Sequence, residues 1–134
     1  MVQGKPLKHR RTILFIDDES AWLEAIQLAV TDKSVKIMTA ASGEEALQKI
    51  HRRKPDLILS DVRMPFMNGF DLFEKIRSNP QYRAVPYVFM SSIDDFDAKH
   101  TAKKLGADGY IEKPYDLEGI KRVLLELLLR FKTT

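Results

Sequence analysis

The chain has 134 residues, of which 44% are hydrophobic and 31% charged, and this composition is typical of one soluble globular domain. It contains no cysteine, which excludes disulfide scaffolds, iron–sulfur clusters, cysteine zinc sites and thiol catalysis. No apolar run reaches the roughly 18–20 residues of a membrane span, and the N-terminus lacks a secretion signal. We therefore expect a cytoplasmic protein with no membrane partner.

The net charge of +3 is concentrated at the N-terminus. Four basic residues without an accompanying acid stand there: Lys5, Lys8, Arg10 and Arg11. The rest of the chain is nearly neutral, so the excess charge belongs to an arm and not to a folded face. We expect a flexible basic arm over residues 1–11, a folded domain over 12–131 and a short tail over 132–134. Direct binding to nucleic acid is not expected.

Hydrophobic periodicity predicts strands that alternate with helices. In chain order, the predicted elements are a strand over 12–16, a helix over 21–30, a strand over 35–40, a helix over 42–51, a strand over 56–61, a helix over 70–77, a strand over 85–90, a helix over 92–106 with Ser92 as its cap, a short strand from 109 and a helix over 116–131. Strands that alternate with helices favour a parallel sheet covered on both faces. The expected fold class is therefore α/β, doubly wound.

Ligands of such sheets bind beyond the carboxyl ends of the strands. Residues with chemically useful side chains follow or end four of the predicted strands: Asp17, Asp18, Asp61, Ser91 and Lys113. Three neighbouring carboxylates repel one another unless a cation neutralises them. Because the donors are all oxygens, Mg²⁺ is the expected ion, with Mn²⁺ as a substitute. Asp61 is the candidate nucleophile toward phosphorus, with Lys113 and Ser91 contacting the phosphoryl oxygens.

Four motifs occur in a fixed order on these elements. They are Ile-Asp-Asp-Glu at 16–19, Asp-Leu-Ile-Leu-Ser-Asp-Val-Arg-Met-Pro at 56–65 with Asn68-Gly69, Met-Ser-Ser at 90–92, and Gly-Ala-Asp-Gly-Tyr-Ile-Glu-Lys-Pro at 106–114. With these motifs, the chain from Arg11 to Phe131 resembles the receiver domain of two-component response regulators, of the single-domain chemotaxis type. The resemblance implies a flavodoxin-like sheet of five strands in the order 2-1-3-4-5.

The resemblance also implies a function. Asp61 would accept a phosphoryl group from a sensor histidine kinase or a histidine phosphotransfer protein and would later lose it to water. Asp18, Asp61 and the backbone carbonyl of Arg63 would bind Mg²⁺ directly, and Asp17 would bind it mainly through water. No enzyme activity is expected beyond this self-catalysed phosphotransfer and dephosphorylation.

The same resemblance implies a switch. Ser91 would move toward the phosphoryl group, and Tyr110 would rotate into the vacated space. This would change the surface of the fourth helix, fifth strand and fifth helix, to which a downstream protein target would bind. The Lys113–Pro114 peptide bond would be cis.

Two questions stay open at this point. Leu125 and Leu129 project from a flank of the last helix, either as edge packing or as a partner surface for a homodimer through the fourth helix, fifth strand and fifth helix. The function has two rivals: a phosphatase of the haloacid-dehalogenase-like type, and a receiver-like module that is never phosphorylated. That phosphatase type has a second aspartate two residues after its nucleophile, whereas Asp17 is followed by Glu19.

Overall fold

A parallel sheet forms the centre of the structure. The computed structural model describes residues 10–30, 32–114 and 116–131. The strands of these residues are β1 (Arg11–Ile16), β2 (Val35–Ala40), β3 (Leu57–Asp61), β4 (Tyr87–Ser91) and β5 (Gly109–Glu112). They form a five-stranded sheet in the order β2-β1-β3-β4-β5, in which each pairing is parallel. The predicted flavodoxin-like fold is therefore confirmed.

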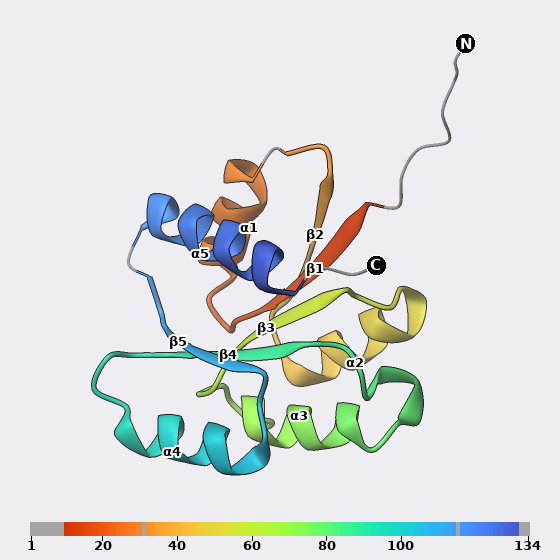
Figure 1. Ribbon diagram of the computed structural model, residues 1–134, viewed down its shortest axis with the longest axis vertical. Helices are drawn as coiled ribbons and strands as arrows, with labels where there is room; N and C mark the ends of the chain where they lie inside the picture. Colours follow the sequence, from red (N-terminus) through yellow and green to blue (C-terminus); the bar gives the residue numbers. More distant parts are fainter. Residues whose placement is uncertain (1–9, 31, 115, 132–134) are drawn as a thin grey trace.

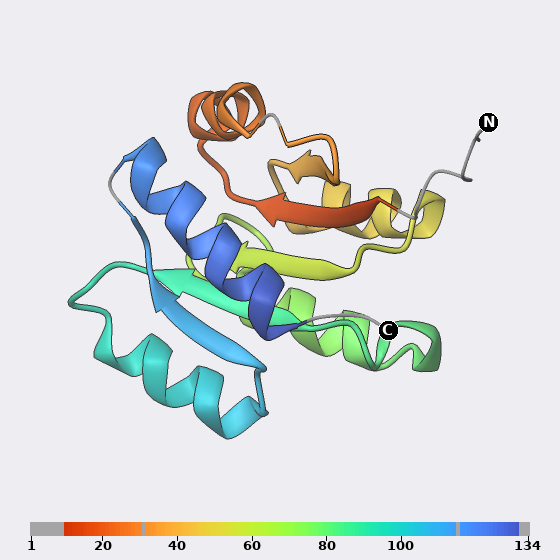
Figure 2. The same ribbon diagram turned by 45° about the horizontal axis from the view of Figure 1, so that its top comes forward.

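Helices cover both faces of the sheet. They are α1 (Ser20–Ala29), α2 (Gly43–Arg52), α3 (Gly69–Arg77), α4 (Phe96–Leu105) and α5 (Leu117–Arg130), with a short 3₁₀ turn η1 (Pro80–Tyr82). Helices α1 and α5 lie on one face, and α2, α3 and α4 lie on the other (Figures 1 and 2). None of the helices in the described ranges has both the length and the apolar character needed to cross a membrane.

Alternate residues of each strand serve the two helical layers. In β1, Leu14 and Ile16 belong to the core beneath α2, α3 and α4, whereas Ile13 and Phe15 belong to the core beneath α1 and α5. Successive side chains of a strand point to opposite faces. A strand covered on both faces must therefore be apolar at every position, which explains the uninterrupted apolar runs in the sequence.

The N-terminal boundary of the fold differs from the prediction. Arg11, assigned to the flexible arm, begins β1 and pairs with Val35. Its guanidinium donates hydrogen bonds to the carbonyl oxygens of Leu128 and Phe131 at the end of α5, and Arg10 donates one to Val35. The positive charge is used here to satisfy carbonyl groups that a helix end leaves unpaired. The rest of the predicted arm, residues 1–9, and the tail, 132–134, lie outside the described residues.

The start of α4 is also later than predicted. Its N-cap is Asp95, whose carboxylate accepts a hydrogen bond from the backbone N–H of Ala98. Ser92, the expected cap, instead donates its hydroxyl to Asp94. Strand β4 continues to Ser91, whose carbonyl accepts from the N–H of Lys113, so the chain needs several further residues to turn into the helix.

Candidate functional site

The carboxyl ends of the strands bring the predicted acidic residues and the lysine together. Asp17, Asp18 and Asp61 can each offer one oxygen such that the three oxygens lie within 4.8 Å of one another. The ammonium of Lys113, just after β5, lies 2.6 Å from Asp17 Oδ2 and 3.5 Å from Asp61 Oδ2. The parallel strands end at the same edge of the sheet, so these side chains lie together although 96 positions separate Asp17 from Lys113.

Burial sets the electrostatics of this cluster. Asp17 is 0% exposed and Asp61 7%, whereas Asp18 is exposed to solvent. Burial raises the pKa of Asp61 to about 6, with the charge of Lys113 opposing the rise and the charge of Asp17 adding to it. For Lys113, burial disfavours the charge, but the hydrogen bond to Asp17 and the charge of Asp61 outweigh it and raise the pKa. Lys113 therefore acts as a counter-ion to both buried carboxylates.

The cluster has the donors that a hard divalent cation requires. Its three acidic members offer only oxygen atoms, the ligands preferred by Mg²⁺. Asp17 Oδ2 is a buried oxygen, and the ammonium of Lys113, 2.6 Å away, compensates its charge. The exposed Asp18 leaves one side open to solvent. These residues fit Mg²⁺, which would take over part of the neutralisation that Lys113 provides.

The start of α3 packs directly against the end of β3. The N–H of Gly69 donates to the carbonyl of Val62, and a Cβ atom at residue 69 would overlap the carbonyl oxygen of Asp61. A side chain there would push the loop away from the candidate nucleophile. In the sequence, Gly69 stands out only as part of a motif, because hydrophobic periodicity does not reveal a close approach of two backbone segments.

The hydroxyl of Ser91 is held by a residue that sequence reasoning missed. Ser91 Oγ donates to Asp95 Oδ2 at 2.9 Å, and Arg63 donates two hydrogen bonds to the same carboxylate, each at 2.9 Å. The pKa of Asp95 falls to about 2, chiefly through the hydrogen bond from Arg63. Tyr110 is partly buried, and its hydroxyl lies 3.4 Å from the backbone carbonyl of Asp95. In a sequence, an aspartate at a helix start is recognisable as a cap, but its pairing with Arg63 and Ser91 is not.

The expected cis peptide bond is not found. The described residues contain no cis peptide bond, so the Lys113–Pro114 bond is trans and that expectation is wrong. The trans isomer is the more stable form of most bonds that precede proline. The ammonium of Lys113 reaches Asp17 with the bond in this form.

A cavity of about 320 Å³ lies beside the acidic cluster. Glu19, Trp22, Ser92, Lys113 and Pro114 line it. Lys113 also pairs with Glu19 at 3.3 Å, so this partly polar cavity adjoins the cluster through the lysine. Trp22 is thereby placed where its fluorescence can report on binding at the site.

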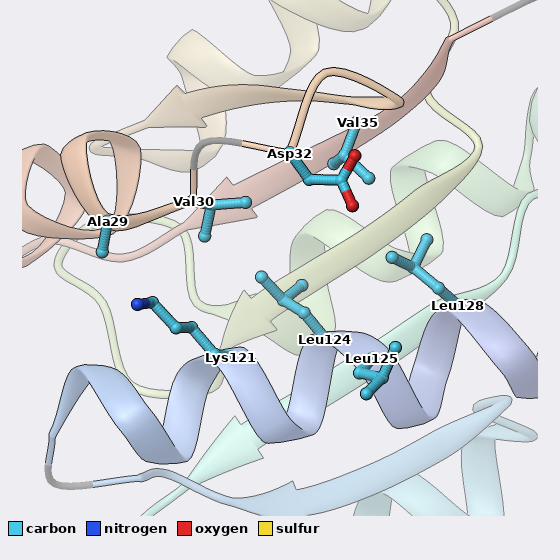
Figure 3. A pocket seen from close by; sticks show the side chains of 8 residues that line it. All are labelled: Ala29, Val30, Asp32, Val35, Lys121, Leu124, Leu125 and Leu128. Atoms are coloured by element: carbon cyan, nitrogen blue, oxygen red, sulfur yellow. The ribbon is translucent and has the colours of Figure 1, made fainter.

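The two exposed leucines of α5 occupy a different part of the molecule. Leu125 is 62% exposed and Leu129 61%. Leu125 lines a cavity of about 330 Å³ with residues at the end of α1 and the start of β2, including Val30 and Val35 (Figure 3). The side of α5 that faces β5 carries Arg130, which donates to the carbonyl of Asp108. Leu125 therefore lies on the α1 side of α5, away from the predicted dimer face.

The chain is similar to proteins of known family. A family model described as the response regulator receiver domain matches residues 13–125. The probable transcriptional regulatory protein TcrX of Mycobacterium tuberculosis is 32% identical over 132 residues, which are 98% of this chain and 53% of that protein. The chain spans about half the length of the curated relatives it matches.

Solved structures give the same result. The chemotaxis protein CheY4 of Vibrio cholerae is 31% identical with a TM-score of 0.77, and the match covers 91% of this chain and 98% of that one. A putative response regulator from Chloroflexus aurantiacus is 29% identical with a TM-score of 0.76, covering 90% and 98% of the two chains.

Proposed function

The chain belongs to the response regulator receiver domains of two-component systems, and on that premise we propose that Asp61 accepts a phosphoryl group in a Mg²⁺-dependent reaction. The donor is the phosphohistidine of a sensor histidine kinase or of a histidine phosphotransfer protein, and the reaction takes place in the cytoplasm. The observation that supports this most is the convergence of Asp61 with Asp17, Asp18 and Lys113.

The residues of the cluster divide the work of the transfer. A carboxylate oxygen of Asp61 forms a bond to phosphorus while the bond from phosphorus to the imidazole nitrogen breaks. The electron pair of the broken bond stays on that nitrogen, and the histidine ring, protonated on its other nitrogen, leaves as neutral imidazole. The ammonium of Lys113 neutralises a phosphoryl oxygen. Asp17, Asp18, Asp61 and the backbone carbonyl of Arg63 would hold Mg²⁺, which supplies further charge neutralisation when bound.

The acyl phosphate is then removed by water, which attacks phosphorus, releases inorganic phosphate and restores Asp61. This self-catalysed step returns the domain to its resting state and does not make the protein a multiple-turnover phosphatase. While Asp61 is phosphorylated, the hydroxyl of Ser91 donates to a phosphoryl oxygen, and Tyr110 rotates into the space that Ser91 has vacated. The surface of α4, β5 and α5 changes, and a downstream protein target binds there.

Intact-mass spectrometry tests this proposal. After incubation with acetyl phosphate and Mg²⁺, we expect the mass of one phosphoryl group to be gained and the label to map to Asp61. The gain should be absent in EDTA and in Asp61→Ala, because each removes a part that the transfer requires. A phosphoryl group on another residue, or uptake that persists in Asp61→Ala, would refute the proposal.

We also propose a homodimer of the phosphorylated form through the face formed by α4, β5 and α5. Because Leu125 lies on the opposite, α1 side of α5, the variant Leu125→Glu should associate as the wild type does. Sedimentation velocity with and without beryllofluoride measures this. Loss of beryllofluoride-dependent association in Leu125→Glu would refute the α4–β5–α5 face as the interface and place the interface at the groove between α1 and α5.

A further inference from the structure

One carboxylate connects the elements around the phosphoacceptor edge that are expected to move. Asp95 accepts hydrogen bonds from the Ser91 hydroxyl at the end of β4, from the Arg63 guanidinium after β3 and from the backbone N–H of Ala98 in α4. Its own carbonyl oxygen lies 3.4 Å from the Tyr110 hydroxyl of β5. The side chain of Asp95 thus connects the end of β4 and the start of α4 to the loop after β3, which lies 32 residues earlier in the chain.

Ser91 cannot hold this bond and also serve the phosphoryl group. Its hydroxyl has a single proton to donate, and in this structure the proton goes to Asp95 Oδ2. Ser91 is 2% exposed, so water does not offer a ready alternative partner. A phosphoryl oxygen on Asp61 must therefore compete with Asp95 for the same proton.

Arg63 strengthens the position of Asp95 as the acceptor of the Ser91 hydroxyl. Its guanidinium grips both carboxylate oxygens of Asp95 with Nε and Nη2 and so fixes the direction in which Asp95 Oδ2 faces Ser91. Arg63 is two residues after Asp61, so the same loop carries both the phosphoacceptor and the group that holds the competing carboxylate. Its side chain is 65% exposed and can leave this position without unpacking the core.

We propose that Asp95, clamped by Arg63, is a latch that retains the Ser91 hydroxyl in the resting orientation and thereby lowers the fraction of the domain in the switched state. This inference rests on the proposed phosphorylation of Asp61. Asp95 is a positioning residue, since it acts on the phosphoryl group only through Ser91. A contact made in the resting state alone shifts the population toward that state, and removing it must favour any ligand that binds the switched state.

The variant Asp95→Asn tests the latch. The amide keeps the size of the side chain and one oxygen that can cap α4, but it removes the charge that Arg63 grips. We expect the concentration of beryllofluoride at half-saturation, followed by Trp22 fluorescence with Mg²⁺ present, to fall by about 10-fold, the size of effect expected for a hydrogen bond to a charged group. General structural damage would weaken binding, so a gain is specific to the latch.

Asp97→Asn is the matched control. It removes the same charge from the first turn of α4, near Arg63 but outside the hydrogen bonds of Ser91, and its half-saturation should stay within about twofold of the wild type. Arg63→Gln removes the clamp without touching the helix cap, and it should also tighten beryllofluoride binding. It keeps the test available if Asp95→Asn does not fold.

Resonances of Tyr110 in labelled protein give a second readout that needs no phosphate analogue. In Asp95→Asn without Mg²⁺ they should move toward the positions that beryllofluoride produces in the wild type. Unchanged half-saturation and unchanged Tyr110 resonances in folded Asp95→Asn and Arg63→Gln would overturn the latch. Absence of phosphoryl uptake by the wild type would instead refute the proposed function, and the two failures are therefore distinguishable.

Discussion

Replacing Asp61 with asparagine should stabilise the Mg²⁺-free protein against unfolding at pH 7.5 by about 3 kcal/mol while it abolishes phosphoryl uptake. Burial and the neighbouring acids raise the pKa of Asp61 from 3.8 to about 6. Each unit of pKa shift corresponds to about 1.4 kcal/mol of free energy. The wild-type protein carries this penalty because the charged carboxylate is the form that phosphoryl transfer needs.

The pH dependence of this stabilisation identifies the buried charge of Asp61 as its cause. The unfolded chain loses the Asp61 proton near pH 3.8, whereas the folded protein keeps it until about pH 6. Between these values the folded state binds more protons, so this group makes the free energy of unfolding fall as the pH rises through the window. Asp61→Asn lacks the group, and the difference between variant and wild type should open from about pH 4 to pH 6 and then stay constant.

Urea unfolding in EDTA from pH 4 to pH 8 measures the difference in the free energy of unfolding between Asp61→Asn and the wild type, and its dependence on pH. Adding Mg²⁺ should stabilise the wild type more than Asp61→Asn, because the variant has lost one negative ligand. Equal or lower stability of Asp61→Asn at pH 7.5 in EDTA would contradict the electrostatic description of the cluster.

Replacing Lys113 with methionine should have the opposite effect on stability. Lys113 lies 2.6 Å from Asp17 Oδ2 and 3.5 Å from Asp61 Oδ2, and Asp17 is fully buried. Removing one partner of a buried ion pair leaves an uncompensated charge, which destabilises a protein by about 3–5 kcal/mol. Since the Lys113 side chain is 22% exposed, we expect a loss of about 3 kcal/mol in EDTA.

Lys113→Met should also slow phosphoryl uptake from acetyl phosphate by about 100-fold, the usual consequence of removing one group that neutralises developing charge. Mg²⁺ should bind the variant more tightly, because no ammonium competes for Asp17 and Asp61. Trp22 fluorescence follows the Mg²⁺ titration, and the rate of mass gain follows the transfer.

Lys121→Met is the control for the loss of a lysine. Lys121 lies on α5, where it pairs with Glu118 at 3.7 Å on the surface, and its replacement should change stability by less than about 0.5 kcal/mol. The double variant Asp61→Asn/Lys113→Met should be more stable than Lys113→Met, because it has one buried carboxylate fewer without a counter-ion. If Lys113→Met is as stable as Lys121→Met, Lys113 is not the counter-ion of Asp17 and Asp61.

Local sequence patterns were enough to predict the order of strands and helices and the edge of the sheet at which the site lies. Those features depend on local patterns: apolar runs for strands covered on both faces, helical spacing, and cap residues such as Ser42 and Asp116, which accept hydrogen bonds from their helices. Because parallel strands share one carboxyl edge, Asp17, Asp61 and Lys113 could be grouped from their positions alone.

Which polar groups pair, and which sides of the helices face one another, depends instead on how the elements pack in the folded chain. Arg63 meets Asp95 across 32 residues, Arg11 meets the end of α5 across more than a hundred, and Leu125 lies on the α1 side of its helix. Such pairings depend on the distance between elements and on side-chain orientation, which the packing of both core clusters sets. Hydrophobic periodicity indicates which positions of an element face the core, but it does not indicate which side chains of other elements they contact.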